Sequence, residues 1–261
     1  MPSPRQASMP PGQLYFAYGS NLWLRQMATR CPNSYYAGRA VLPDYRWQIN
    51  ERGYANIVPA SGFTVHGLVY ELGPGDEPRL DRSEGVASGA YSKAYLPIIL
   101  HPASAALRVS TRSLVEDGPE RVVGAARQQM RHVRKPEASL WPGVLVYVSH
   151  DFVRWGKPRD EYIDRINSGI SDAIVMGVPG DFFENSLRSL IPRRPIIHNV
   201  SRRPSLRSRA TPQTPSSPEA RRSKSVGNRG PSPDSEDETG RRDYEYHRSR
   251  GRSNTSFWYY L

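Results

Sequence analysis

The chain has 261 residues, enough for one large domain or two small ones. Its net charge of +11 is unevenly distributed: residues 192–261 hold 15 Lys and Arg against 7 Asp and Glu, which leaves only +3 on residues 1–191. Because residues 1–191 are nearly neutral, the basic composition gives no indication that this part of the chain binds nucleic acid.

Residues 192–261 are rich in Ser, Pro and Arg and poor in apolar residues. Such a composition buries too little apolar surface to offset the entropy lost on ordering. We therefore predict a disordered N-terminus over residues 1–12, one folded domain over 13–191 and a disordered tail over 192–261.

Cys31 is the single cysteine, which excludes an intrachain disulfide and is typical of a reducing compartment. Residues 1–11 lack the apolar core of a signal peptide, and apolar runs such as 144–148 are too short to span a membrane. We expect a soluble cytoplasmic protein without a membrane partner. Nuclear residence stays open, because an Arg-rich tail is also typical of import signals.

Strand patterns dominate the first 150 residues, where apolar, aromatic and β-branched residues recur between turn residues. Eight strands are predicted at residues 14–18, 35–42, 45–49, 54–58, 64–72, 91–100, 106–114 and 143–149. Pro43-Asp44 and Gly62 are read as breaks between strands.

Helices are fewer, and they lie mostly near the end of the domain. We predict them at residues 22–30, 76–84, 159–176 and 180–190, with a polar, partly helical insertion at 115–140. Because strands come in runs with few strand–helix alternations, the fold class is α+β, with a mainly antiparallel, barrel-like sheet and flanking helices.

The turn after the first strand is the first candidate site. Gly19 lets a ligand approach the backbone, and Ser20 and Asn21 are preferred N-cap residues for a helix starting at Leu22. Unpaired amides at a helix start can hold a carboxylate or a developing oxyanion. The alternative, a strand-to-helix connection with a good cap and no further role, is equally consistent with these residues.

Glu84 is the second candidate, because it falls at the C-terminal end of the predicted helix 76–84. The negative end of the helix dipole opposes ionisation of a carboxyl group there, which would raise its pKa and make it a useful base near neutral pH. The alternative is an exposed Glu neutralised by Arg82 or Lys93.

No cofactor or metal site is expected from the sequence. His66, His101, His132, His150 and His198 are scattered without metal-ligand spacing, and phosphate-binding or dinucleotide-binding motifs are absent. This pattern favours chemistry carried out by side chains and backbone amides.

Two motifs resemble those of the γ-glutamylcyclotransferase family. Residues 18–22 match its Tyr-Gly-Ser-Asn-Leu opening, residues 80–86 match the Leu-Asp-x-x-Glu-Gly-Val context of its catalytic Glu, and residues 88–91 resemble its Gly-x-Tyr step. The resemblance covers about residues 13–190. The opening differs from the Tyr-Gly-Ser-Leu form of relatives that degrade glutathione directly, and the insertion and tail differ from compact members.

The resemblance implies a cofactor-free enzyme that cyclises the γ-glutamyl group of a small-molecule substrate to 5-oxoproline and releases an amine. It implies Glu84 as catalytic residue and Tyr18, Gly19, Ser20, Asn21, Leu22 and Tyr147 as substrate-binding residues, with Tyr162 a weaker candidate. A tyrosine at either of these last two positions is more often a core residue than a ligand-binding one. The substrate stays open between a γ-glutamyl amino acid, glutathione and a specialised metabolite conjugate.

The alternative function is an inactive member of the fold that acts as a binding or regulatory protein. In that case the arginines of residues 192–261 would contact nucleic acid phosphates or a protein partner. We favour a solvated regulatory tail instead, because Ser/Thr-Pro pairs at 211–212, 214–215, 217–218 and 232–233 are typical of sites for proline-directed kinases.

Overall fold

The computed structural model describes residues 12–129 and 137–194. The predicted disordered segments at 1–12 and 192–261 lie almost entirely outside the described residues, so their disorder stays a prediction. Part of the predicted insertion, residues 130–136, also lies outside.

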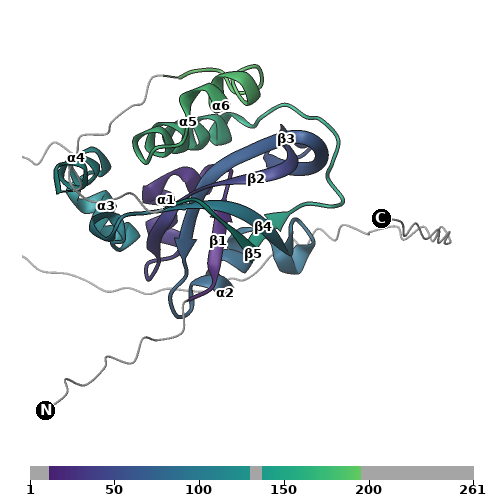
Figure 1. Cartoon of the computed structure of the whole chain (residues 1–261). Coiled ribbons are helices and arrows are strands. Elements are labelled where there is room, and N and C mark those ends of the chain that lie inside the picture. Colours follow the sequence, from purple (N-terminus) through teal and green to yellow (C-terminus); the bar gives the residue numbers. More distant parts are fainter. Residues whose placement is uncertain (1–11, 130–136, 195–261) are drawn as a thin grey trace, which may run out of the picture. The chain divides into compact units, whose positions relative to one another are not determined.

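The sheet of the described residues forms a closed barrel, which confirms the predicted fold class. Its five strands are β1 (Leu14–Ala17), β2 (Tyr35–Ile49), β3 (Ala55–Glu71), β4 (Ser92–Pro102) and β5 (Ser139–Val148). Their order around the barrel is β1–β3–β2–β4–β5 (Figure 1). Neighbours pair antiparallel except β1 and β5, which run parallel and join at Tyr15 and Leu145.

Two of the predicted strand breaks are wrong. Residues 35–49 form one strand and residues 55–71 another, so four predicted strands become two. Pro43-Asp44 lies at a register shift in which Asp44 takes a positive φ of 59°, and the Gly62 amide donates a 3.0 Å hydrogen bond to Asp44 Oδ1. The turn residues therefore mark a bulge that bends a continuous hairpin.

The predicted strand at 106–114 is also wrong. Residues 105–107 form a short 3₁₀ helix and Thr111–Asp117 forms α3. Ser110 caps α3, because its hydroxyl accepts a 3.1 Å hydrogen bond from the Ser113 amide. Apolar residues alternate in this segment because a partly buried loop is followed there by a helix.

The remaining helices agree with the sequence in place, with shifts of a few residues at their ends. They are α1 (Leu24–Arg30), α2 (Asp76–Ser83), α4 (Pro119–Gln129), α5 (Asp160–Val175) and α6 (Gly180–Ser186). Figure 1 shows α5 and α6 next to each other along the side of the barrel where β2 and β3 run. His66 of β3 packs against Phe182 of α6 there, with ring centroids 5.0 Å apart.

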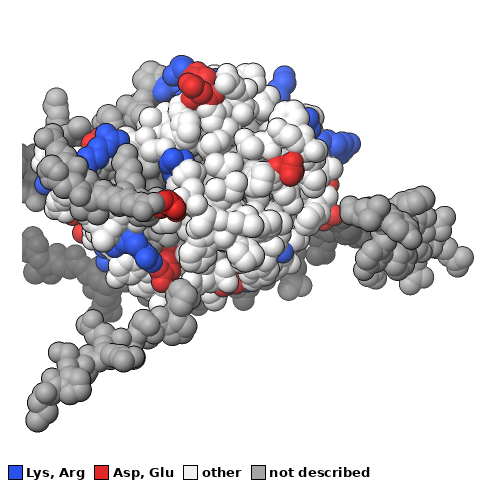
Figure 2. All heavy atoms as spheres, viewed as in Figure 1, with Lys and Arg blue, Asp and Glu red and all other residues white. Residues whose placement is uncertain are grey.

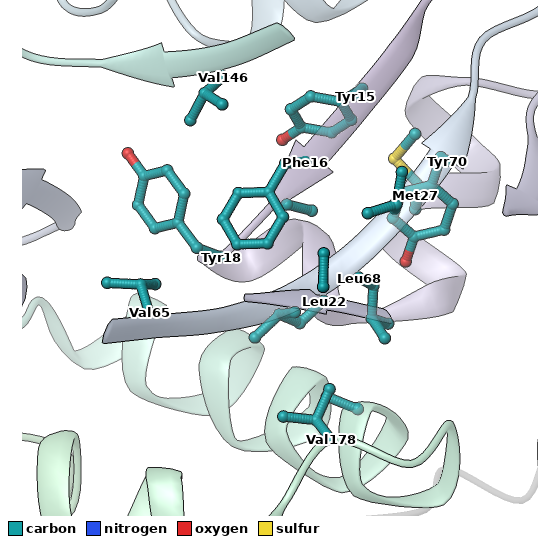
Figure 3. Close-up of a cluster of buried hydrophobic side chains, with 14 of the residues drawn as sticks. Tyr15, Phe16, Tyr18, Leu22, Met27, Val65, Leu68, Tyr70, Val146 and Val178 are labelled. Carbon is teal, nitrogen blue, oxygen red and sulfur yellow. The ribbon is translucent and has the colours of Figure 1, made fainter. Parts of the chain in front are cut away.

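β1 runs through the centre of the hydrophobic core. Tyr15, Phe16 and Tyr18 are buried and spread into the core from β1 and its end, and Leu22 and Leu68 lie in the same cluster (Figure 3). Each fully buried apolar side chain contributes on the order of 1.5–3 kcal/mol. The turn that follows β1 is therefore anchored on a rigid element.

Charged side chains on the described surface are scattered. On the face in Figure 2, Lys and Arg alternate with Asp and Glu over a largely uncharged surface. Among residues 12–129 and 137–194, none of the helices combines the length and the apolarity needed to cross a bilayer.

Gly67 provides a test of the barrel packing. A Cβ at this position of β3 would overlap the carbonyl oxygen of Ala17 and come within 2.8 Å of the Phe16 ring. Gly67→Ala should lower the free energy of unfolding by about 1–3 kcal/mol, because the strands have to separate to accept a methyl group. Urea denaturation measures the change.

The control is Gly124→Ala in α4, where a Cβ meets nothing within 4 Å. The same chemical change should there stabilise by about 0.5–1 kcal/mol, because Ala restricts the unfolded chain and favours helix. Equal stability of the Gly67 variant and the wild type would contradict the packing.

Candidate functional site

A cavity of about 290 Å³ lies where the end of β1 meets the C-terminal end of α2. This volume is at the lower end of the range for small-molecule sites. Its lining combines six tyrosines, four arginines and Glu84, the only carboxylate among the described residues that line it. The tyrosines are Tyr15, Tyr18, Tyr54, Tyr91, Tyr147 and Tyr162.

Glu84 follows the last residue of α2, as the sequence predicted, and its side chain is 16% exposed. Its Oε1 accepts a 3.0 Å hydrogen bond from Asn21 Nδ2 and lies 3.3 Å from Arg30 Nη1. Both contacts go to Oε1, so within the described residues Oε2 has no hydrogen-bond partner. One carboxylate oxygen is held in place and the other remains available to a ligand.

The pKa of Glu84 is raised above its ordinary value, mainly because burial disfavours the charged form. Arg30 and the Asn21 hydrogen bond oppose this rise. The direction agrees with the sequence prediction, but its main cause is burial and not the helix dipole. The predicted neutralising partners are wrong: Lys93 pairs with Glu77 and Asp81 at 2.8 and 2.7 Å, and Arg30 is the partner of Glu84.

Asn21 connects the turn after β1 to Glu84. Its Nδ2 donates to Tyr15 Oη at 2.8 Å and to Glu84 Oε1, while its Oδ1 accepts from Gln26 Nε2 and Arg30 Nη1, both at 2.9 Å. Two donors and two acceptor positions use the full hydrogen-bonding capacity of an amide side chain. Asn21 is only 3% exposed, so its orientation is fixed.

The predicted helix start at Leu22 is wrong, and Ser20 and Asn21 are not side-chain caps. Residues 20–22 form a 3₁₀ turn, and α1 begins at Leu24, whose amide donates to Asp172 Oδ2 at 2.8 Å. The amide of Leu22 donates to the Gly19 carbonyl at 2.9 Å. Fewer amides of this turn are therefore open to a ligand than the sequence predicted.

Leu22 differs from the other predicted binding residues. It is fully buried in the core cluster (Figure 3). It does not line the cavity. Gly19, Ser20 and Asn21 do line it. A Cβ at Gly19 would lie 3.2 Å from Tyr162 Oη, which is tight enough that Tyr162 would have to shift slightly to accept a side chain there.

Tyr18 and Tyr147 both line the cavity, but their hydroxyl groups have partners in the protein. Tyr18 Oη donates to the Tyr147 carbonyl at 2.6 Å, and Tyr147 Oη donates to Asp81 Oδ1 at 2.7 Å. Tyr147 also packs edge-on against Tyr15, with centroids 5.7 Å apart. Both tyrosines are thus rigid walls of the cavity.

Several lining residues were missed by the sequence analysis. Arg30 comes from α1, Arg52 from the turn between β2 and β3, and Tyr15 from β1. No spacing in the sequence relates these residues to Glu84, since only the closing of the barrel brings them together. Tyr162, the weaker candidate, lines the cavity from α5.

The described residues contain no cluster of three or more His, Cys, Asp or Glu placed to hold a metal ion. The polar groups that face the cavity are instead hydroxyl, amide, guanidinium and carboxylate groups. The cavity thus has the size of a small-molecule site, and Glu84 is the one carboxylate among the described residues that line it.

Residues 15–111 match the family model described as "Gamma-glutamyl cyclotransferase, AIG2-like". The Gamma-glutamylcyclotransferase of Mus musculus is 35% identical over 88 residues, which cover 30% of this chain and 47% of the relative. The Homo sapiens protein of the same name is 33% identical over 88 residues, which again cover 30% of this chain and 47% of the relative. An uncharacterized protein from Homo sapiens of known structure gives a TM-score of 0.49 at 21% identity, covering 71% of this chain and 92% of the other.

Residues 15–111 are therefore similar to the gamma-glutamyl cyclotransferase, AIG2-like family, and this range includes both motifs that carried the resemblance in the sequence. The matched range 15–111 contains β1 except Leu14, the turn with Asn21, and Glu84, but not Tyr147 or α5. The chain spans about half the length of the curated relatives that it matches.

The raised pKa of Glu84 has a consequence for stability. The folded state binds this proton more tightly than the unfolded state, so the stabilisation is full below the ordinary pKa of 4.5 and is lost as pH rises through the higher folded value. Glu84→Gln removes this loss. The free energy of unfolding of the variant, relative to wild type, should therefore be larger at about pH 8 than at about pH 4.

Urea denaturation of both proteins at the two pH values measures this difference. A difference independent of pH, or one that shrinks as pH rises, would show that burial does not raise the pKa of Glu84.

Proposed function

We propose that this protein is a γ-glutamylcyclotransferase that converts γ-glutamyl amino acids, or related γ-glutamyl peptides, to 5-oxoproline and a free amine. The observation that carries the proposal is the position of Glu84. This carboxylate lies in the family-matched range, faces a cavity of ligand size and keeps Oε2 free.

The reaction needs no second substrate. The α-amine of the γ-glutamyl group attacks its own γ-carbonyl carbon, a new C–N bond closes the five-membered ring, and the C–N bond to the departing amine breaks. One proton leaves the attacking nitrogen and one reaches the departing nitrogen, so atoms and charges balance. A cavity that holds the folded-back conformer supplies much of the acceleration.

Glu84 is suited to carry that proton in both directions. Its raised pKa brings it closer to neutral pH, where a base accepts and returns a proton most efficiently. Arg30 and Asn21 hold Oε1 and leave Oε2 toward the substrate. We assign Glu84 as the catalytic residue, and Arg30 and Asn21 as positioning residues.

The turn after β1 is the proposed wall for the γ-glutamyl group. Gly19 and Ser20 line the cavity, and Tyr15 Oη, which accepts from Asn21, keeps its own proton for a ligand oxygen. Leu22 supports the turn through core packing and makes no direct contact. Tyr18 and Tyr147 shape the cavity.

The residues assigned here all lie between 15 and 165, so the proposal places the reaction within the predicted domain 13–191. It gives residues 192–261 no part in the chemistry. The proposed partner is a small γ-glutamyl molecule, and the Ser/Thr-Pro pairs of the tail remain proposed kinase sites.

The direct test is Glu84→Gln, assayed for release of 5-oxoproline from γ-glutamyl-alanine. The amide keeps the shape and the acceptor for Asn21 but cannot take the proton, so the rate should fall by roughly 10²–10⁴-fold. The matched control is Glu77→Gln on the same helix, which pairs with Lys93 outside the cavity. If the Glu84 variant keeps its activity, Glu84 is not the catalytic base.

Arg30 gives a second test, through the pH profile. Its charge lowers the pKa of Glu84 against the effect of burial, so Arg30→Met should raise that pKa further. Since the base acts only when deprotonated, the acidic limb of kcat/KM should move to higher pH. Arg25→Met, an exposed position of α1 outside the cavity, is the control. If the acidic limb of kcat/KM does not move, Arg30 does not influence the pKa of Glu84.

A further inference from the structure

Four arginines border the cavity, and two of them are already paired. Arg30 contacts Glu84 and Asn21. Arg165 bonds Glu161 Oε2 at 2.7 Å and lies over the Tyr162 ring at 5.3 Å. The other two, Arg52 and Arg82, form no ion pair within the part of the chain that the structure describes.

Arg52 is the more unusual of these two. Its Nη1 is buried and has no hydrogen-bond partner among the described residues, while its guanidinium lies 4.8 Å over the Phe152 ring. A guanidinium with an unsatisfied donor is costly, and because Arg52 lines the cavity, a bound anion is a candidate partner for it. Arg82 is exposed on α2, where water can solvate the charge.

The turn that carries Arg52 is held rigidly. Asn50 Oδ1 accepts hydrogen bonds from the amides of Arg52 and Tyr54 at 3.1 and 3.2 Å, and Asn50 is fully buried. Arg159 Nε donates to the Arg52 carbonyl at 2.9 Å. The backbone of the turn is thus fixed at three points, and the Arg52 side chain is packed on the Phe152 ring, so less freedom is left to lose on binding.

Arg52 also lies apart from the network around the base, since no hydrogen bond joins it to Glu84, Asn21 or Arg30. It still lies within electrostatic range of the same cavity wall. Burial raises the pKa of Tyr91, the Glu84 charge adds to the rise and the Arg52 charge opposes it. The Glu84 and Arg52 charges therefore both act on the wall that Tyr91 forms.

We propose that Arg52 binds a carboxylate on the departing amine, and so selects γ-glutamyl compounds whose amine part is an amino acid over neutral γ-glutamyl amides. The identity of the reaction rests on the proposed function, whereas the preference for an anionic ligand rests on Arg52 itself. A guanidinium matches a carboxylate with two parallel hydrogen bonds, and burial strengthens them. Arg52 is thus a specificity-determining residue.

The test compares γ-glutamyl-alanine with γ-glutamyl-alaninamide, which differ only in the carboxylate of the departing group. Binding of each is measured by calorimetry in the Glu84→Gln protein, where ring closure is blocked, and turnover is measured in the protein with Glu84 intact. The variant is Arg52→Met. The control is Arg154→Met. Arg154 forms an ion pair with Glu51, the neighbour of Arg52 in the chain, and neither Arg154 nor Glu51 lines the cavity.

Arg52→Met should weaken binding of the acid by about 10- to 100-fold and leave binding of the amide nearly unchanged. In turnover the same factor should appear in KM, with kcat largely kept, because the carboxylate is bound alike before and during ring closure. Arg154→Met should change neither compound.

Equal binding of acid and amide before the substitution, equal weakening of both after it, or binding of neither would each overturn the proposal. Failure of the proposed function is separable from these outcomes. If the protein binds the acid through Arg52 but releases no 5-oxoproline, the proposed reaction is wrong and the proposed anion site still holds.

Discussion

The hydrogen bond between Asn21 and Glu84 is the contact on which the site depends. It joins residues 63 positions apart, so it exists only when β1 and the end of α2 meet at the same end of the barrel. Asn21 is buried and bonded at all four of its hydrogen-bonding positions. Since a buried polar group left without partners costs free energy, the network forms as a whole or not at all.

Burial and charge act against each other at Glu84. Burial raises the pKa of the Glu84 carboxyl group, whereas the Arg30 charge lowers it. The effect of burial is the larger, so the pKa stays above its ordinary value. The protein thereby carries a carboxylate that lowers its stability at high pH, a cost typical of functional groups and rarely found at structural positions.

The barrel could be anticipated from the sequence, because strand patterning survives in β1, β4 and β5. The number of strands could not, since Asp44 and Gly62 carry turn chemistry that serves a bulge between paired strands. Turn residues in the sequence indicate that the backbone bends. Whether the strand also ends there depends on its hydrogen-bond pairing with the neighbouring strand.

The site shows the same division between local signals and packing. Glu84 and the turn of residues 19–21 stand in short recognisable motifs, so they were predicted. Arg30 and Arg52 were not, because each reaches the cavity from its own element and neither has a spacing that relates it to Glu84. Asn21 was predicted for the site with the wrong role, as a helix cap, because its partners are distant in sequence.

Most polar groups of the cavity are already bonded within the protein, and this limits what a ligand can contact. Tyr18 and Tyr91 donate to backbone carbonyls at 2.6 Å, and Tyr147 donates to Asp81. The groups left over include Glu84 Oε2, the Tyr15 hydroxyl proton and the Arg52 guanidinium. These supply one base, one neutral donor and one cationic donor. A ligand that satisfies all three needs an exchangeable proton, a carbonyl or hydroxyl oxygen, and a separate anionic group. An amide with a carboxylate beyond it meets this requirement, whereas a simple amine or a neutral amide leaves the guanidinium unpaired.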